Sequence, residues 1–496
     1  MFFSPQSKSI QCDLGKSKDS HCSFTQDEAG GITIFVLIMS VLLLVAGGMA
    51  VDFQRQELAR ADLQNALDRG VLAATNNYHE FDTSGTLTLN EQAEQVILDY
   101  IASRNYQTAG LNLSVNVVDA GGKRVVTASA NHPVETVFLR MMGLSALGVN
   151  VNAGAVYAAP KLEITLVLDV SGSMGSNSTS APGTKLAQLQ VAAKQFIDTI
   201  LDADSAAQTL ISIVPFSQQV NLPRAMADVY NIDRTHDYSS CIDFHEFDFQ
   251  TTAMTLSHTT PTRPYEQGQH FIENNAGRTN VHYGCPRLMN VVTPFSNNPT
   301  QLKTAIDALA SESWTATYLG VKWGAALLDP TSRPVVDAMI ASGDLSANFA
   351  GWPHAWSDPS VRKITVVMSD GKNTKLNEIV PVQYSAHTPA YWNQNAPTSS
   401  QKISIIDNDN SVTTDPDGTR RGQGDRLLKD ICEAARIGVN STIYTIGFEL
   451  AGEPIAIAAL DACASSPTTA YLVEGVDITT AFQNIADEIV NLKLTN

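Results

Sequence analysis

The sequence predicts an α/β fold with a mostly parallel sheet in residues 160–496. Two apolar runs, Ile164–Leu168 and Ile364–Met368, have the length and composition of buried parallel strands. An apolar, helix-like stretch that extends through Leu328 lies between them. Strands that alternate with helices in this way are typical of α/β domains.

Polar side chains follow both predicted strands. Asp169, Ser171 and Ser173 come directly after the first run, and Asp370 comes just after the second. The carboxyl ends of parallel strands are where α/β sheets hold their ligands. Gly172 allows the tight turn that lets these side chains converge. An oxygen-only set with few charges favours Mg²⁺ or Mn²⁺ over Zn²⁺.

Together with the segment Ser313–Gly320, these motifs resemble a von Willebrand factor type A domain. The resemblance implies a doubly wound, Rossmann-like sheet flanked by helices and a metal-ion-dependent adhesion site. Thr315 is preferred to Thr317 as a ligand because Gly320 then falls where the family has a glycine. The family usually has Gly-Gly or Gly-Asn where this chain has Ser313-Trp314. The implied metal positions are Asp169, Ser171, Ser173, Thr315 and Asp370.

In this family the serines and the threonine contact the metal, and the aspartates act largely through water. The resemblance therefore implies Mg²⁺ or Mn²⁺ as the cofactor and a protein partner that offers a carboxylate to the ion. Two long interruptions, at about 217–299 and 372–424, leave the predicted sheet near this site. Loops of that length are usually functional or disordered, so we expect them to form a rim that faces the partner.

Length and composition limit the classes of protein. A chain of 496 residues is too long for one ordinary domain, and its 44% hydrophobic content supports packed cores. The net charge of −18 argues against nucleic-acid binding, which needs a basic face.

Residues 32–51 carry no charge. At about 1.5 Å per residue they are long enough for the hydrocarbon layer of a bilayer, which is roughly 30 Å thick. We expect an uncleaved single-pass anchor; a cleaved signal peptide and a buried core helix are the alternatives. The span is expected to continue as a helix, so that residues 30–80 form one segment after a tail at residues 1–29.

Small and aliphatic side chains recur at helical spacing after the span. They are expected to pack on a neighbouring helix, on the following domain or within the helix's own domain. The stripe is Ala59, Leu63, Ala66, Leu67, Gly70, Val71 and Ala74.

Residues 85–158 predict a small α/β spacer or assembly unit without a catalytic constellation. Helices are expected at Asn90–Arg104 and Val134–Leu144. Alternating sequence predicts strands at Leu111–Val117 and Arg124–Ala130.

The cysteines indicate the orientation in the membrane, because the basic residues on the two sides of the span are balanced. Cys12 and Cys22 precede the span, whereas four cysteines follow it, an even number that fits disulfides in an oxidising compartment. This places the amino terminus in the cytoplasm and the carboxyl part in the periplasm. The four later cysteines are Cys241, Cys285, Cys432 and Cys463.

Two interpretations compete for Cys241 and Cys285. With His245 and His282 they have the spacing of a Cys₂His₂ zinc site, but a disulfide is favoured in an extracytoplasmic setting. Cys432 and Cys463 are the parallel case and are expected to form a second disulfide. A calcium loop that begins at Asp407 is a weaker possibility, since Val412 stands at the position that requires glycine.

The amino-terminal anchor also resembles TadG-like proteins of the Flp, or tight-adherence, pilus machinery. The resemblance is carried by Gly30-Gly31, the apolar span and an alanine-rich continuation that begins with Asp52 and Arg55. In that family a von Willebrand A region follows the anchor. The carboxyl segment contributes Cys432, Ile443–Phe448, Cys463, Ala481–Ile485 and Leu492.

The span and the cysteines thus indicate a single-pass inner-membrane protein with a periplasmic carboxyl part. The two resemblances imply that this part binds proteins and acts in Flp pilus assembly or anchoring. A surface adhesin that uses the same metal is one alternative. A metal-dependent hydrolase is another, although the histidines are scattered and no hydrolase motif is present. We therefore expect no enzymatic activity.

Overall fold

The computed structural model describes thirteen stretches of the chain: residues 29–76, 86–103, 109–120, 123–158, 160–201, 206–257, 263–276, 280–407, 413–414, 420–421, 423–438, 441–475 and 477–494. The chain divides into two compact units, Met1–Val118 with Val125–Val156, and Asp119–Arg124 with Tyr157–Asn496. The tail predicted at residues 1–29, with Cys12 and Cys22, lies outside the described residues except for Ala29.

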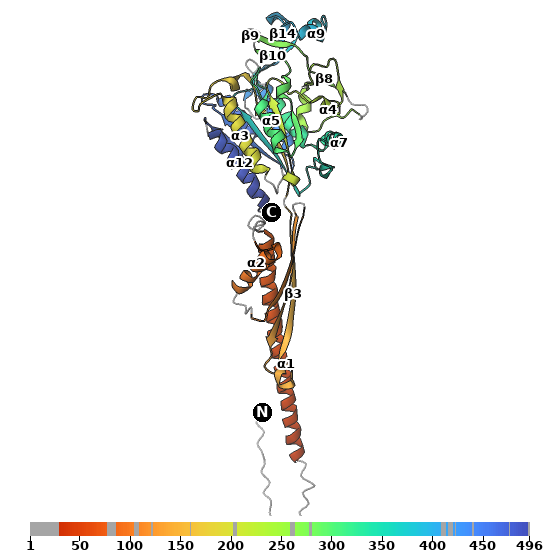
Figure 1. Ribbon diagram of the computed structural model, residues 1–496, viewed down its shortest axis with the longest axis vertical. Helices are drawn as coiled ribbons and strands as arrows, with labels where there is room; N and C mark the ends of the chain where they lie inside the picture. Colours follow the sequence, from red (N-terminus) through yellow and green to blue (C-terminus); the bar gives the residue numbers. More distant parts are fainter. Residues whose placement is uncertain are drawn as a thin grey trace, which may run out of the picture. The chain divides into compact units, whose positions relative to one another are not determined.

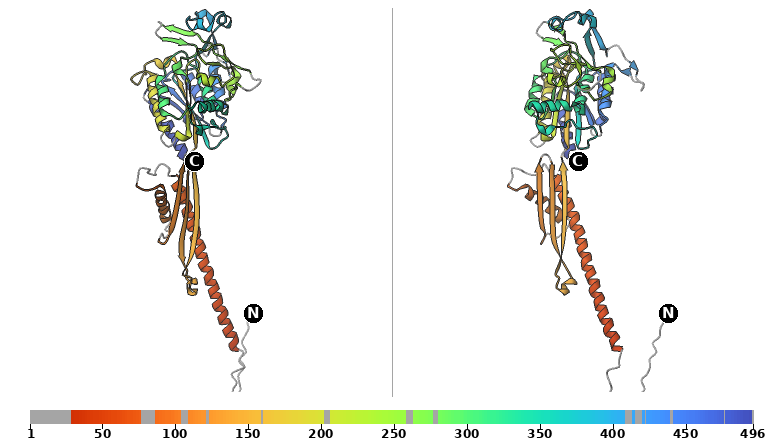
Figure 2. Two further views of the ribbon diagram at one scale, coloured as in Figure 1. Left: turned by 45° about the vertical axis from the view of Figure 1, so that its right-hand side comes forward. Right: turned by 90° about the vertical axis from the view of Figure 1, so that its right-hand side faces the viewer.

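The first unit is built on one long helix, α1 (Ala29–Asn76), which continues without a break from the predicted span (Figure 1). By length and composition, the part of α1 from Ile32 to Asn76 could cross a membrane. A short helix and a three-stranded sheet of order β1-β2-β3 lie along its carboxyl-terminal part (Figure 2). These elements are α2 (Leu89–Ser103), β1 (Asn112–Ala120), β2 (Lys123–Glu135) and β3 (Ala146–Ala158).

The stripe of small and aliphatic residues on α1 packs inside its own unit. Leu63, Leu67 and Val71 are buried in one cluster with Ile97 of α2 and Val126 of β2. The two segments that the sequence predicts at 30–80 and 85–158 are therefore joined by a common core. Burial of this face stabilises the second half of α1, whose sequence alone would leave an apolar stripe exposed.

The prediction of a helix at Val134–Leu144 is wrong. Strand β2 continues to Glu135, and a 3-10 turn at Leu139–Met142 connects it to β3. Gly143 adopts a left-handed φ of 88° and closes this turn, which ends any helix at that point. The backbone bond from Thr136 N to Ser145 O, 3.0 Å long, makes β2 and β3 a hairpin.

The second unit confirms the predicted fold class. Its six-stranded sheet has the order β11-β5-β4-β12-β17-β18, and only β11 pairs antiparallel among these strands. The strands are β4 (Lys161–Asp169), β5 (Thr209–Phe216), β11 (Thr293–Ser296), β12 (Val361–Ser369), β17 (Ser441–Phe448) and β18 (Ala470–Val473).

Helices cover both faces of this sheet, as burial of its central strands requires. One face carries α3 (Lys185–Ile200), α5 (Pro299–Ala308) and α12 (Asp477–Leu494). The other carries α6 (Thr317–Leu328), α7 (Arg333–Ser342), α10 (Gln423–Ala435) and α11 (Pro454–Cys463). A Cβ on Gly320 would lie 2.6 Å from the Phe216 ring and 2.8 Å from Val167, so this glycine lets α6 approach the sheet closely.

The first interruption is shorter than the predicted 217–299, because Thr293–Ser296 forms the edge strand β11. It contains α4 (Arg224–Ala227), β6 (Ile232–Asp233), β7 (Ile242–Asp243), β8 (Tyr265–Gln267), β9 (Ile272–Ala276) and β10 (Asn280–Tyr283).

The second interruption follows β12 and precedes α10. It contains β13 (Lys375–Ile379), α8 (Pro381–Tyr384), α9 (Pro389–Trp392), β14 (Lys402–Asp407), β15 (Thr413–Thr414) and β16 (Arg420–Arg421). Most of the possible calcium loop after Asp407 lies outside the described residues.

Disulfides join Cys241 to Cys285 and Cys432 to Cys463. These are the two pairings favoured from the sequence, and the first excludes the Cys₂His₂ zinc alternative. Cys241–Cys285 closes a loop within the first interruption, whereas Cys432–Cys463 ties α10 to α11.

Candidate metal centre

The candidate site lies where the order of the strands reverses. The chain enters the sheet at β4, adds β5 on one side and later adds β12 on the other. Residues Leu168 and Met368 are level with each other in the parallel ladder, so the two strands end side by side. A crevice outside the carboxyl ends of adjacent strands at such a switch point is the usual ligand site of an open α/β sheet.

Four of the five predicted metal residues are joined there by hydrogen bonds. The Ser171 backbone N–H donates to Asp169 Oδ1 (2.8 Å), and the Ser171 and Ser173 hydroxyl oxygens are 3.0 Å apart. The Ser173 hydroxyl in turn donates to Asp370 Oδ1 at 2.6 Å. Asp169, Ser171 and Asp370 are buried while Ser173 is exposed, so the group opens to solvent at Ser173.

Thr315, the fifth residue, lies on a loop that contacts both the loop after β4 and the loop after β12. Its carbonyl oxygen accepts from Thr374 N (2.8 Å) and its N–H donates to Thr374 Oγ1 (2.9 Å). On the other side of the loop, Gly172 N donates to Ser313 O (2.9 Å). These contacts are with the backbone of the loop, and the structure shows no hydrogen bond that joins the Thr315 side chain to the four described site residues.

The backbone at Ser313 has the conformation that the glycine of the family pattern would adopt. Its φ is 61°, a left-handed conformation that glycine adopts without strain and serine does not. The backbone therefore has the shape that a glycine would favour, although the residue is serine. Gly172 is required as well, because a Cβ there would lie 3.0 Å from Ser313 O.

The electrostatics of the site are set by two buried carboxylates. Burial, together with the nearby charge of Asp370, raises the pKa of Asp169 to about 7. Lys185, at the start of α3, forms an ion pair with Asp370 Oδ2 at 2.9 Å. The Lys185 ammonium also lies 3.9 Å from Glu449, so it pairs with two acidic side chains of the site.

The donor set fits a hard divalent cation. It combines carboxylate and hydroxyl oxygens without nitrogen or sulfur, which is the chemistry that Mg²⁺ and Mn²⁺ prefer. Within the described stretches no group of three or more His, Cys, Asp or Glu side chains is placed to hold a metal ion.

Three residues of the site were not predicted from the sequence. The Ser369 hydroxyl donates to Asp169 Oδ2 (2.7 Å), and Lys185 lies 3.9 Å from Glu449 as well as against Asp370. Ser369 had a local signal, since it ends the same strand that precedes Asp370. Lys185 and Glu449 had none, because only the fold brings them to this edge of the sheet.

The two interruptions meet beside the site at Glu273 of β9. Its carboxylate accepts from Trp314 Nε1 (3.3 Å) and Asn377 Nδ2 (3.0 Å), and it pairs with Lys402 at 3.2 Å. Trp314 directly precedes Thr315 and is 43% exposed. Glu273 thus links both interruptions to the loop that carries Thr315.

Comparison with known protein families finds a match for the amino-terminal segment. Residues 30–77 match the family model described as "Putative Flp pilus-assembly TadE/G-like". The amino-terminal segment of this chain is therefore similar to TadE/G-like proteins. The TadE/G-like segment coincides with α1 and includes the apolar residues 32–51, which confirms the predicted resemblance of the anchor. No curated protein matches the chain.

Solved structures similar to the chain include pilus proteins. The pilus adhesin SpaC from Lactobacillus rhamnosus GG is 11% identical, with a TM-score of 0.35, and covers 77% of this chain. The chain covers 34% of SpaC. The von Willebrand factor domain of the type V pili tip protein Mfa5 from Porphyromonas gingivalis is 14% identical, with coverage of 68% and 98% of the two chains and a TM-score of 0.34. Likeness at these identities says nothing of what this chain binds.

Proposed function

We propose that the chain is a membrane-anchored, extracytoplasmic protein-binding module that acts in the assembly or anchoring of a Flp-type pilus. The observation that carries the proposal is the convergence of Asp169, Ser171, Ser173 and Asp370 at a switch point of the sheet. The TadE/G-like segment connects this module to pilus assembly. Partner binding rather than catalysis is favoured, because no hydrolase motif accompanies the three carboxylates of the site, Asp169, Asp370 and Glu449.

Mg²⁺ or Mn²⁺ would be held by the serine hydroxyls and Thr315, with Asp169 and Asp370 balancing its charge. The ion would supply an attraction for a carboxylate on the partner, which a neutral hydroxyl set lacks. Ser369 and Lys185 would orient the two aspartates. The interruptions, joined at Glu273, would provide the specificity around this centre.

The proposed location follows from the anchor and the disulfides. Residues 32–51 would cross the inner membrane of a Gram-negative-type bacterium once, and their apolar side chains are almost entirely exposed in the structure. Both disulfides lie in the second unit and are typical of an oxidising compartment. The second unit would therefore lie in the periplasm and the amino terminus in the cytoplasm.

Retention of pilus-assembly proteins on the purified full chain, with Mg²⁺ and with a chelator, tests the proposal. In cells, Asp370→Ala is expected to reduce surface pili as severely as deletion of the protein. Asp337→Ala is the matched control, because Asp337 is an exposed aspartate on α7 of the same unit. Full piliation with Asp370→Ala at normal protein levels would contradict a metal-dependent role in assembly.

A further inference from the structure

The turn between β2 and β3 exposes a cluster of large apolar side chains. We call residues 137–144 the hairpin tip. Soluble surfaces rarely expose so many neighbouring apolar groups without a partner. The exposed fractions are 57% for Val137, 40% for Phe138, 86% for Met141, 61% for Met142 and 53% for Leu144.

Asp52 of α1 fixes the hairpin tip to the helix. Its carboxylate accepts three backbone bonds, from Val137 N (2.9 Å), Phe138 N (2.8 Å) and Leu139 N (2.8 Å). Asp52 is 2% exposed, so the bonds are shielded from water. The position of the tip along α1 is therefore set by charge-assisted hydrogen bonds.

The hairpin tip reaches past the end of the apolar span. The Phe138 ring lies against Gly48, where a Cβ would come within 2.4 Å of the ring. Gly48 precedes Val51, the last residue of the apolar span, by three residues. At 1.5 Å per residue, the contact lies about 4.5 Å inside the end of the span.

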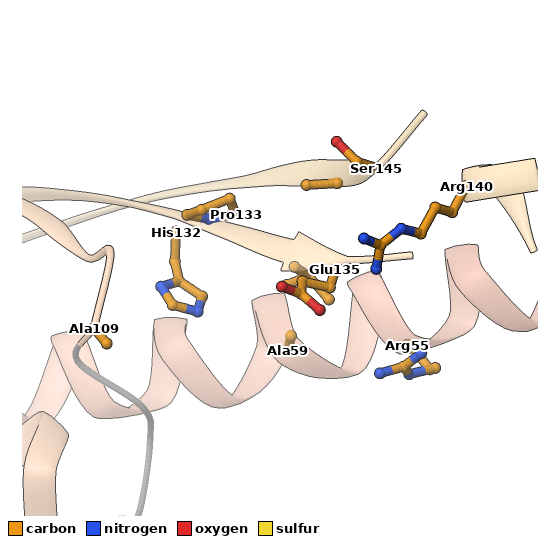
Figure 3. A pocket seen from close by; sticks show the side chains of 10 residues that line it. Arg55, Ala59, Ala109, His132, Pro133, Glu135, Arg140 and Ser145 are labelled. Atoms are coloured by element: carbon orange, nitrogen blue, oxygen red, sulfur yellow. The ribbon is translucent and has the colours of Figure 1, made fainter. Parts of the chain in front are cut away.

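Two arginines lie just beyond the contact between Phe138 and Gly48. Arg55 of α1 and Arg140 of the hairpin tip are both exposed, and both line a cavity of about 640 Å³ beside Glu135 and His132. Figure 3 shows Arg140 extending from the hairpin toward Glu135, above the helix that carries Arg55. Arginines at the edge of an apolar segment reach lipid phosphates while their stems stay in the apolar layer.

We propose that the hairpin tip is a second membrane contact. The tip would enter the leaflet that lies nearer to the carboxyl-terminal half of α1. Met141, Met142 and Phe138 would lie in the apolar layer, and Arg55 and Arg140 at the lipid headgroups. The contact would fix the rotation and depth of α1 and hold the first unit against the bilayer.

Lipid is the occupant that the geometry favours. The exposed side chains of the tip are continuous with the apolar face of α1, because Phe138 covers Gly48 within the span. A carboxylate at a bilayer edge is unfavourable unless it is satisfied, and Asp52 receives three donors. The inference rests on the proposed membrane span at residues 32–51.

The test uses the full chain with Cys12→Ser and Cys22→Ser in vesicles of phosphatidylethanolamine and phosphatidylglycerol. A fluorescent label on Met141→Cys is compared with the same label on Leu43→Cys, inside the span, and on Ser129→Cys. Ser129 is exposed on β2, nine residues from Phe138. At about 3.3 Å per residue this is roughly 30 Å along the hairpin. Quenching by spin-labelled lipid and by aqueous iodide reports the surroundings of each label.

The proposal predicts that the labels at positions 141 and 43 are quenched by lipid and protected from iodide severalfold relative to position 129. Asp52→Ala should increase iodide access at position 141 and leave position 43 unchanged. If the label at position 141 is in water and the label at position 43 is in lipid, the tip proposal alone is overturned. This holds whether the tip binds protein or nothing. Position 43 in water overturns the span and the tip together.

Discussion

Two buried aspartates of this chain show how the surroundings of a carboxylate decide its role. Asp52 of the first unit accepts three backbone N–H bonds and has no second carboxylate among its recorded partners. Asp169 of the second unit accepts one backbone N–H and the Ser369 hydroxyl, and the charge of Asp370 lies close by. Both side chains are almost fully buried.

The difference separates a carboxylate with a structural role from one that we propose binds a metal. The Asp52 carboxylate is satisfied by the N–H groups of Val137, Phe138 and Leu139. At Asp169, burial and the nearby charge of Asp370 raise the pKa to about 7, although hydrogen bonds from Ser171 and Ser369 act in the opposite direction. Asp52 is thus satisfied by its own chain, whereas Asp169 is a carboxylate for which we propose a bound cation.

The largest expected effect is on ion binding. Asp169→Ala should abolish binding of Mg²⁺ or Mn²⁺ to the purified full chain, because the remaining serines are weak neutral ligands. Asp52→Ala should bind the ion as wild type does. Calorimetric titration of both variants measures this. Equal affinity in wild type and Asp169→Ala would remove Asp169 from the metal site.

Next in size is the effect of Asp52 on the hairpin tip. Asp52→Ala should accelerate amide hydrogen exchange at Val137, Phe138 and Leu139 by about 10- to 100-fold, because the three N–H groups lose their charged acceptor. Asp62→Ala, an exposed aspartate on the same helix, should leave exchange unchanged. Exchange as slow in Asp52→Ala as in wild type would show that other contacts hold the tip.

Gly48 and its neighbour Gly47 form a matched pair that tests whether the hairpin tip packs on α1. Gly48→Ala should displace the Phe138 ring and speed exchange at the tip, by an amount that corresponds to about 1–3 kcal/mol of overpacking. Gly47→Ala should not, because nothing lies within 4 Å of a Cβ there. If the two variants behave alike, the tip does not pack on Gly48.

Thr315 is expected to have a smaller effect on ion binding than Asp169. Loss of one neutral oxygen ligand in Thr315→Ala should weaken Mn²⁺ binding by on the order of tenfold. Thr317→Ala is the control, since Thr317 begins α6 and its N–H donates to Asn373 Oδ1 at 2.8 Å. The reverse ranking of the two variants would assign the ligand to Thr317.

The smallest expected effect is on pH dependence without metal. Because the folded state raises the pKa of Asp169, its contribution to stability is greatest at low pH and is lost between about pH 4 and pH 7. In chelator, Asp169→Asn should remove the decline in denaturant stability between pH 4 and pH 7. An unchanged decline would contradict the raised pKa.

The sheet and the core of the site could be predicted because their signals are local. The runs that become β4 and β12 are apolar on both faces, and the site residues follow them at once in the sequence. The contacts of Lys185 with Asp370 and of Asp52 with Leu139 join residues 185 and 87 positions apart. No local pattern reports such pairs.

The segment Val134–Leu144 was misread because its apolar residues fit a helix about as well as the end of a strand. What decides its structure is pairing between β2 and β3, together with the left-handed Gly143. Strand β3 was missed although its residues Val149 and Val151 alternate with exposed ones. Pairing across a hairpin is a tertiary property, and it overrides the preference of a short segment.

The most direct test of the account is titration of the wild-type full chain with Mn²⁺, followed by the electron paramagnetic resonance signal of the free ion. If Asp169 and Asp370 need a cation from outside, one ion per chain should be held, and Mg²⁺ should displace it. A wild-type chain that leaves the free Mn²⁺ signal unchanged would contradict the claim that this site binds a metal.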